Sequence, residues 1–367
     1  MRVLALLFAV APALFAQTPP VEPSTAIEPA APVASVAPDK SDEVPGDELS
    51  REGKKGASAG LNWLLQAQNE DGSWGEDAKC EAEVACTAMA GLALLSSGET
   101  GRDGKHRAAV ARAVKWITKR ALASGRQMRG APSSIETYLG EHIGDYLACA
   151  FLAEALGMVP EAATDESTGA ALRKLVRRVQ SWQREDGSWN DGVEPLTTTA
   201  IAYVALRAAH NAGVTVEDAS LERVVKYVES RIDTNKKVVV DPVHGDRPRF
   251  TGTAGSLRVL LGVGHDQTPE GRVASGILVK LPFGRDYGDE VSGEDFFGGV
   301  LAAHAMIHED GKAWRGVFAK IQKVLTSCQN LDGSWTGHHC ISARTFCTAS
   351  AVTTLLTPLR FLPMIQM

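Results

Sequence analysis

The chain has 367 residues, of which 44% are hydrophobic and 22% are charged, and its formal net charge is −6. This composition is typical of a globular protein, and the length allows one large domain or two smaller ones. The mild acidity, without a clustered basic stretch, excludes the usual footprint of a nucleic-acid partner.

The first sixteen residues have the features of a secretory signal peptide. One Arg precedes an unbroken apolar run, and the small residue Ala16 offers a cleavage point. No run in the sequence reaches the roughly 20 apolar residues that a membrane span needs. We therefore expect residues 1–16 to direct a secreted or periplasmic location, with a short buried helix as the alternative.

Residues 17–50 are rich in Pro, Ala, Val, Ser and acids and show no helical or strand period. Such a segment cannot bury enough apolar surface to offset the entropy of ordering it. We expect a disordered tether here, followed by a folded domain over residues 51–367.

Three copies of one seven-residue turn organise that domain. The copies read QNEDGSW (68–74), QREDGSW (183–189) and QNLDGSW (329–335). An amphipathic helix ending in Gln precedes each copy, and a helix rich in small apolar residues follows it. Asp-Gly favours a tight turn because Gly takes positive φ at no steric cost. We expect the Trp to lie back over the end of the preceding outer helix, and the Gln to bond backbone groups left open at that helix terminus.

Weaker copies of the same helix pair fill the long gaps between the three turns. A Thr-Ala dipeptide recurs inside the second helix of four pairs, beginning at Thr87, Thr199, Thr253 and Thr348. Counting three degenerate pairs with the three strong ones gives six pairs of outer and inner helices. The prediction is an all-α fold, a closed α/α toroid of six helix pairs, with an open helical array as the alternative.

The Gln-x-x-x-Gly-x-Trp element before an inner helix resembles the QW repeat of squalene-hopene and oxidosqualene cyclases and of protein prenyltransferase β subunits. The likeness covers about residues 55–360, and the three DGSW turns are its most specific elements. The resemblance implies the toroid fold of the terpenoid cyclase and prenyltransferase superfamily. Because one fold hosts several chemistries, activity has to be argued from the site.

The cyclase motif of that family is degraded in this chain. Class II terpene cyclases resembling this fold protonate an alkene with Asp-x-Asp-Asp directly before a Thr-Ala helix start, and the central acid needs partners that keep it protonated. The corresponding residues 83–86 contain one acid, Glu83, and the corresponding residues 195–198 and 344–347 contain none. With only 6% aromatic residues to face a carbocation, we expect a divergent member that does not cyclise terpenes.

The zinc motif of protein prenyltransferases is degraded as well. The nearest stretch, residues 293–299, has two acids but no Cys, and the later His position aligns with Cys347. The His-His-Cys run at 338–340 has zinc-ligand types without a standard spacing, and a solvated loop or a disulfide is the alternative. The chain also lacks a nucleophile elbow, a phosphate loop and a dinucleotide fingerprint. We expect no metal and no cofactor.

Acidic residues gather at the expected starts of the inner helices, whose N-termini should point to one mouth of the ring. The candidate catalytic acids are Glu83, Asp145, Glu294 and Asp295. The candidate ligand-binding residues are Glu141, His142, His304 and Arg344. The alternatives are a first turn whose acids favour the helix dipole, for residues 138–146, and a satisfied inner-helix residue, for His304.

Six cysteines in an exported chain allow disulfides. Cys86 and Cys347 each follow a motif Trp by twelve residues, and Cys80 and Cys340 are matched in the same way. Since the first and last units are neighbours in a closed ring, Cys80–Cys340 or Cys86–Cys347 is predicted to staple the seam. Buried free thiols are the alternative.

Three functions remain open at this point. The leading one is binding of an apolar ligand, or a polymer segment, in the ring cavity. The second is isoprenoid-type catalysis by the acids at the ring mouth, and the third is a protein-interaction scaffold. An acidic cluster with one raised pKa favours the enzyme, whereas a cavity filled by its own side chains favours the scaffold.

Overall fold

The structure, a computed structural model, describes residues 46–125, 128, 133–189, 192–284, 290–309 and 311–366, apart from the side chains of residues 162 and 163. The predicted signal peptide (1–16) and most of the predicted tether (17–50) lie outside the described residues. The first helix begins at Arg51.

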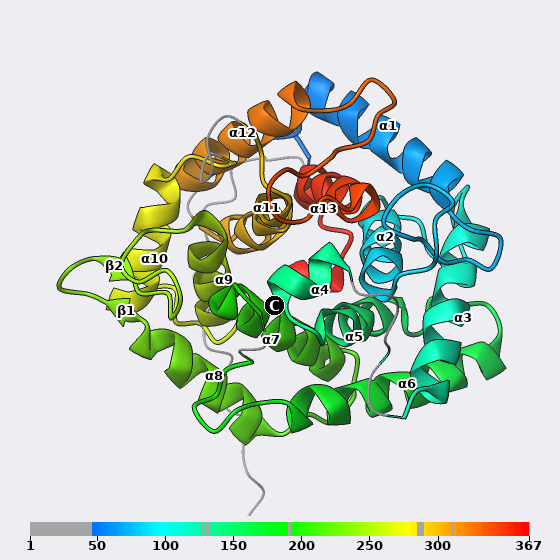
Figure 1. The fold of residues 1–367 in the computed structure, drawn as a ribbon, viewed down its shortest axis with the longest axis horizontal. Coiled ribbons are helices and arrows are strands. Elements are labelled where there is room, and N and C mark those ends of the chain that lie inside the picture. The colour runs from blue at the N-terminus through cyan, green and yellow to red at the C-terminus, as the bar shows by residue number, and fades with distance from the viewer. Residues whose placement is uncertain are drawn as a thin grey trace, which may run out of the picture. The chain divides into compact units, whose positions relative to one another are not determined.

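Six outer and six inner helices alternate along the described chain (Figure 1). The outer helices are α1 (Arg51–Ala67), α3 (Arg107–Ala123), α6 (Ala162–Ser181), α8 (Asp218–Ser230), α10 (Pro269–Lys280) and α12 (Gly311–Ser327). The inner helices are α2 (Val84–Ser96), α5 (Ile143–Ala155), α7 (Pro195–Asn211), α9 (Phe250–Leu261), α11 (Gly293–Met306) and α13 (Arg344–Leu356). The remaining elements are the short helix α4 (Ser134–Leu139), the antiparallel strands β1 (Ile232–Asp233) and β2 (Val238–Val239), and the 3-10 helices η1 (Thr357–Leu359) and η2 (Pro363–Gln366).

The two kinds of helix bury different amounts of surface, as their sequences predict. Every residue of α2 and of α11 is buried, because small and apolar side chains let neighbours approach from all sides. Outer helix α12 buries one stripe, which includes Trp314, Phe318, Ile321 and Leu325 at helical spacing. The inner helices therefore form the core, and the outer helices cover it with one face each.

The ring is closed rather than open. Each inner helix packs against the next one along the chain, and the last, α13, packs against the first, α2. Helix α1 also packs against α13, where Gly60 approaches Val352 and Trp335 closely (Figure 1). The predicted α/α toroid of six helix pairs is confirmed.

Each DGSW turn is fixed to the outer and the inner helix of its own unit. In the first copy, the Trp74 indole Nε1 donates to Leu64 O at the end of α1 (2.7 Å), which confirms the predicted position of the Trp. The backbone N–H of Trp74 donates to Thr87 Oγ1 in α2 (3.0 Å), so the Thr of the Thr-Ala dipeptide holds the turn.

Within the described residues, the Gln side chain does not bond the end of its own helix, contrary to expectation. Gln68 Nε2 donates to Gly72 O in the turn and to Ala109 O in the next outer helix, each at 3.0 Å. The third copy does the same across the seam, where Gln329 Nε2 donates to Gly333 O (2.8 Å) and to Gly56 O in α1 (3.0 Å). The Gln thus ties neighbouring units together, because the next outer helix passes closer to its amide than its own helix end does.

Two separate constraints favour glycine in each turn, its backbone conformation and the space around it. Gly72, Gly187 and Gly333 have φ of 95°, 93° and 91°, which side chains rarely adopt. A Cβ on Gly187 would also lie 2.3 Å from Arg223 O in the next outer helix. The same glycine therefore makes the turn and lets two units approach.

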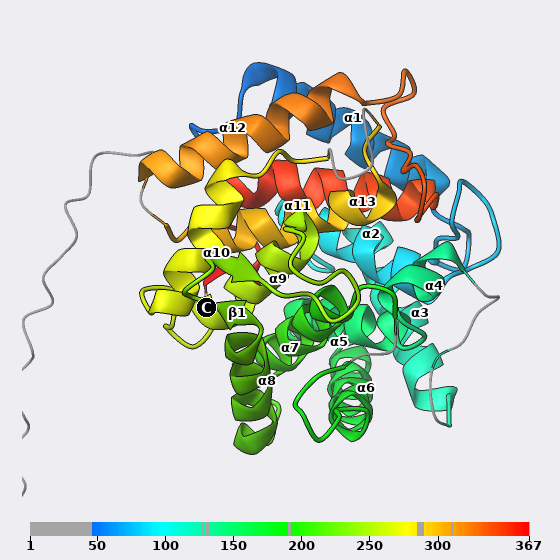
Figure 2. The same cartoon turned by 60° about the vertical axis from the view of Figure 1, so that its left-hand side comes forward.

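The two mouths of the ring are covered by different segments. Helix α4 packs against α5 and α7 and lies across the ring at the mouth where the inner helices begin (Figure 1). Residues 357–366, here the C-terminal segment, pack where the inner helices end: the backbone of Met364 bonds to Glu154 near the end of α5 and to Arg258 near the end of α9. Figure 2 shows the same helices from the side.

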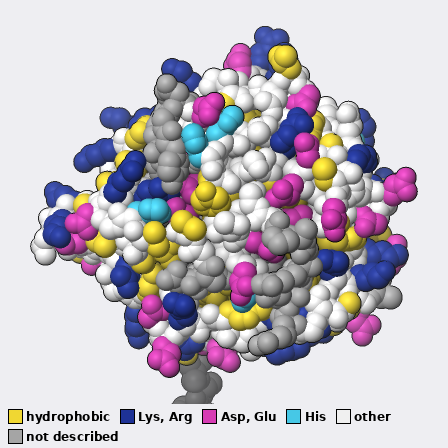
Figure 3. Space-filling model, in the orientation of Figure 1, with side chains coloured by type: hydrophobic (Ala, Val, Ile, Leu, Met, Phe, Trp, Pro, Cys, Tyr) yellow, Lys and Arg dark blue, Asp and Glu magenta, His cyan; other side chains and the backbone are white. Residues whose placement is uncertain are grey.

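The surface shows no preference for one charge sign on the face drawn in Figure 3. Basic and acidic side chains are scattered together over this face, and hydrophobic side chains lie in small groups between them. No helix of the described chain is both long and apolar enough to cross a membrane.

Candidate functional site

The four candidate catalytic acids all lie at the starts of inner helices. Glu83 is the N-cap residue of α2, Asp145 lies in the first turn of α5, and Glu294 and Asp295 lie in the first turn of α11. Each of the four is buried. Their carboxylates, however, are held by separate partners rather than converging on one space.

Glu83 stabilises the start of its own helix. Its Oε2 accepts the N–H of Cys86 at 2.5 Å, and burial raises the pKa of this carboxyl. A cavity of about 280 Å³ lies beside it, with Glu76, Cys80 and Ser133 among the described lining residues. The other three candidate acids do not line this cavity, but Asp77 and Glu81 do, together with Glu76, whose charge also raises the pKa of Glu83. The carboxylates beside Glu83 are therefore not the ones predicted from the sequence.

Asp145 is held in a buried ion pair. Arg178 Nη1 of α6 donates to Asp145 Oδ1 at 2.8 Å, and the N–H of Met128 donates to Oδ2 at 2.9 Å. Burial nevertheless raises the pKa of Asp145, against the lowering by these two donors. The ion pair joins outer helix α6 to inner helix α5 and so stabilises the fold.

Glu294 belongs to a charged cluster that sequence reasoning missed. Arg249 Nη2, at the N-cap of α9, donates both to Glu294 Oε1 and to Glu194 Oε1 at the N-cap of α7 (2.8 Å to Glu194). His244 Nε2 lies 2.9 Å from the same Glu194 oxygen. Both carboxylates and Arg249 are almost fully buried. Three consecutive inner helices are thus joined at their N-termini by one guanidinium.

Asp295 is engaged locally. Ser292 Oγ donates to Asp295 Oδ2 at 2.7 Å, and the N–H of Asp295 donates back to Ser292 Oγ at 3.3 Å. Thr251 Oγ1 of α9 lies 3.4 Å from Oδ1. This reciprocal arrangement caps α11.

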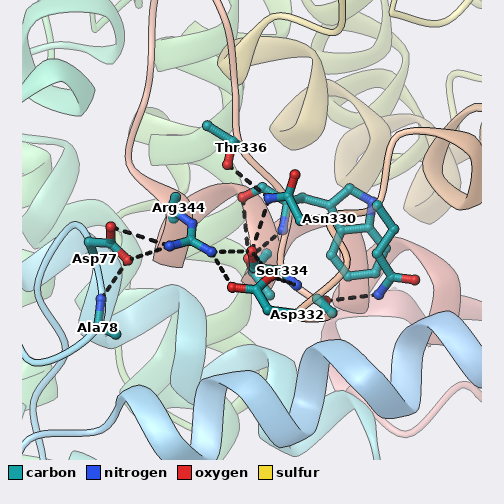
Figure 4. A network of polar contacts seen from close by, with 11 residues as sticks. Asp77, Ala78, Asn330, Asp332, Ser334, Thr336 and Arg344 are labelled. Carbon is teal, nitrogen blue, oxygen red and sulfur yellow. Dashed lines mark hydrogen bonds and ion pairs between the residues drawn. The ribbon is translucent and has the colours of Figure 1, made fainter.

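Arg344, predicted to bind a ligand, lies at the seam between the last unit and the first (Figure 4). Its Nη1 is 3.2 Å from Asp77 Oδ1 of the first unit, while its Nη2 contacts Asp332 and donates to Ser334 Oγ at 2.7 Å in the third turn. The guanidinium also lies 5.1 Å from the ring centre of Trp63 in α1. Arg344 therefore ties the closing units of the ring together.

Two further candidates lie away from the ring centre. The His142 ring lies against Trp182 in a tilted arrangement, with centroids 3.8 Å apart and the ring planes at 52°, and the Glu141 side chain is half exposed. The described residues contain no group of three or more His, Cys, Asp or Glu arranged to hold a metal ion.

The cysteines are free thiols in this structure. Cys86 and Cys347 lie at the seam formed by α2 and α13, both are fully buried, and burial raises the pKa of each thiol. The proposed Cys80–Cys340 and Cys86–Cys347 disulfides stay predictions.

The centre of the ring holds a small closed cavity. Its volume is about 30 Å³, enough for one or two water molecules, whereas small-molecule sites usually measure about 300–1,000 Å³. The described lining residues are Met89, Leu92, Leu147, Ala150, Ile201, Val204, Arg258, Phe297, Val300, Leu301, His304, Thr353, Leu362 and Met364. Among the eight candidate site residues, His304 is the one in this lining.

The C-terminal segment fills the centre from the end where the inner helices finish. Leu362 and Met364 line the cavity and are almost fully buried. The N–H of Met364 donates to Glu154 Oε2 (3.0 Å), its carbonyl accepts from Arg258 Nη2 (2.5 Å), and His308 Nε2 bonds to Ile365 O (2.5 Å).

Arg258 and Glu154 were not predicted from the sequence. Arg258 is the one charged residue of α9, and Glu154 lies near the end of α5 in the small and apolar stretch LAEAL. A charged residue in such a stretch was the available signal. Burial lowers the pKa of Arg258 to about 10 and raises the pKa of Glu154 to about 7. Burial together with the nearby Arg258 charge lowers the pKa of His304 to about 3.

We expect the stability contributed by Glu154 to fall as pH rises. Its folded pKa of about 7 exceeds the ordinary 4.5, so the folded state binds the proton more tightly and this contribution is complete below pH 4.5. This stabilising contribution, about 3 kcal/mol, is lost as the pH rises past 7. Glu154→Gln keeps an acceptor for the Met364 N–H without titrating. The difference in unfolding free energy, wild type minus Glu154→Gln, should fall by that amount between pH 4.5 and 8, measured by urea denaturation; a constant difference would contradict the assignment.

The fold and this closed centre define an α/α toroid, a class that contains both terpenoid cyclases and glycosidases. No protein-family model matches the chain. Over 85 residues it is 32% identical to protostadienol synthase A from Arthroderma gypseum, a match that covers 20% of this chain and 11% of that protein. The chain thus spans about a tenth of the curated relative it matches.

Two solved structures align with most of the chain. The type II terpene cyclase MstE from Scytonema aligns over 85% of this chain and 100% of its own, with a TM-score of 0.40 and 15% identity. An alpha-1,6-mannanase from Salegentibacter sp. HEL1_6 aligns over 84% of this chain and 99% of its own, with a TM-score of 0.55 and 8% identity. The toroid is confirmed, and the local match to a synthase supports the resemblance to the terpenoid cyclase superfamily.

Proposed function

We propose that this chain is an exported, non-cyclising toroid that binds an apolar small molecule at the centre of its ring, in the space now held by the C-terminal segment. The proposal rests on how the central cavity is closed. The centre is lined mainly by Met, Leu, Ile, Val and Phe side chains, and a terminal segment rather than an inner helix completes its wall at one mouth.

Displacement of that segment is physically accessible. A short segment held by few hydrogen bonds opens at lower free energy than the packed core of a domain. Residues 362–366 are held by three backbone hydrogen bonds and by the burial of Leu362, Met364 and Ile365. An apolar ligand that replaces these side chains recovers the same kind of burial.

The site supports binding better than cyclisation. No carboxylate is among the described residues lining the central cavity, so no acid stands ready to protonate an alkene there. Phe297 is the one aromatic residue in that lining, whereas a carbocation needs several aromatic faces. The four candidate acids at the other mouth are engaged in helix caps and ion pairs.

A native mass spectrum tests the proposal. The mature protein, isolated without reductant from the exported compartment, should begin after Ala16 and carry an added mass that organic extraction removes. In a titration with dodecanol, a chain ending at Phe361 should take up the alcohol more readily than the full chain. A bare mass, together with no dodecanol uptake by either chain, would refute binding at the ring centre.

An interaction scaffold is the second candidate function, because the ring centre is filled by the protein's own side chains. A groove of about 790 Å³ runs along the seam between α1 and α12. Asn62, Gln66 and Asn330 contribute amides to its lining, Leu331 is fully exposed, and Lys55 and Asp332 add charges of both signs. This mixture suits the polar rim of a protein partner better than an apolar small molecule.

A further inference from the structure

Arg258 stands out among the residues around the central cavity. Its side chain is fully buried and lines the cavity, and its Nη2 donates to Met364 O. Within the described residues, Nε and Nη1 of this guanidinium have no hydrogen-bond partner. A buried cation with unused donors is costly, so such a group is usually matched by an acceptor or an anion in the working state.

Two further polar groups near Arg258, the Tyr203 hydroxyl and His304 Nε2, have no hydrogen-bond partner among the described residues. Arg207 adds a second positive charge, which lowers the pKa of Arg258 further. Glu154 is the one carboxylate that acts on Arg258, and it accepts the Met364 N–H. This end of the cavity is therefore electropositive, and Nε and Nη1 of Arg258 are its unused donors.

The rest of the lining has the opposite character. Met89, Leu147, Ile201, Phe297 and Val300 present apolar side chains to the same small space. A ligand that matches both ends has an apolar chain and one acidic group. The Met364 carbonyl, held by the guanidinium, occupies the position that an anionic oxygen would take.

We propose that the ring centre binds an amphipathic anion, an apolar chain ending in a carboxylate or a phosphate, whose acidic group replaces the Met364 carbonyl on Arg258. The inference rests on the proposed function and names the class of ligand. Binding then requires release of residues 362–366, because the head group and this segment compete for one guanidinium.

Calorimetric titration of the full chain with three twelve-carbon probes tests the proposal, with the two acidic probes below their micelle concentrations and dodecanol below its solubility limit. Dodecanoate or dodecyl phosphate should bind at least tenfold more tightly than dodecanol, and whichever is tighter identifies the head group. Arg258→Met should remove this preference while keeping dodecanol binding. Arg207→Met, a neighbouring arginine outside the cavity lining, is the matched control and should keep the preference.

A chain ending at Phe361 should bind the acidic probes more tightly than the full chain, and Leu362→Ala provides a milder weakening of the same segment. Equal affinity for dodecanol and for both acidic probes, unchanged by Arg258→Met, would overturn the acidic head group and leave apolar binding intact. Failure of all three probes to bind the full chain, the shortened chain and Leu362→Ala would overturn both the inference and the proposed function.

Discussion

Arg249→Met should lower the free energy of unfolding by about 3–5 kcal/mol, the cost of removing one partner from a buried ion cluster. Arg249 is shared by Glu194 and Glu294, and all three side chains are almost fully buried. Without the guanidinium, two carboxylates at the N-termini of α7 and α11 lose the charge that balances them. Urea denaturation at pH 7 measures the loss.

The triple variant Arg249→Met, Glu194→Gln, Glu294→Gln is the matched control, because it removes the cation together with both anions. It should recover most of the stability, since replacing a whole buried ion cluster by neutral groups is often close to neutral. A loss below 1 kcal/mol for Arg249→Met alone would show that the cluster contributes little to the fold.

Trp335→Ala should cost about 3–5 kcal/mol, the range for deleting a large buried aromatic side chain. Trp335 is fully buried at the seam, where its Nε1 donates to Leu325 O at 2.8 Å and its ring packs against Gly60 of α1. The substitution opens a cavity between the last turn and the first helix and leaves a buried carbonyl without its donor. Thermal and urea unfolding of the variant measure the effect.

Trp116→Ala is the comparison for that experiment. Trp116 is partly buried on α3, and its indole donates to Asp71 Oδ2 at 2.9 Å in an exposed contact. Its loss should cost about 1 kcal/mol or less. Equal losses for the two variants would mean that the Trp of the DGSW turn has no special part in closing the ring.

The toroid could be predicted because its units repeat. Three copies of DGSW marked three helix pairs, and small-residue inner helices marked the other three, so each unit was readable from local spacing alone. Leu362, Met364 and Ile365 of the C-terminal segment are buried as well. That this segment packs into the ring centre depends on contacts with α5 and α9, which no local pattern carries.

The positions of the four candidate acids at the helix starts could be predicted, but the groups that pair with them could not. Parallel inner helices bring their first turns to one mouth, and for this reason Glu83, Asp145, Glu294 and Asp295 were correctly placed there. Their partners come from other elements: Arg178 lies on an outer helix, and Arg249 follows a loop between units. Such pairings depend on the closed ring and cannot be read along the chain.

The closure of the ring also has a consequence for biosynthesis. During synthesis α1 and α2 leave the ribosome first. The sides of these helices that face away from the second unit are buried against α13, the last helix of the ring to be synthesised. Contacts so distant in sequence form late, because the intervening chain must be ordered before they contribute. A product that stops anywhere short of α13 keeps an exposed apolar edge on its first unit. A product that lacks α13 therefore cannot close the ring, however many of the earlier helices it contains.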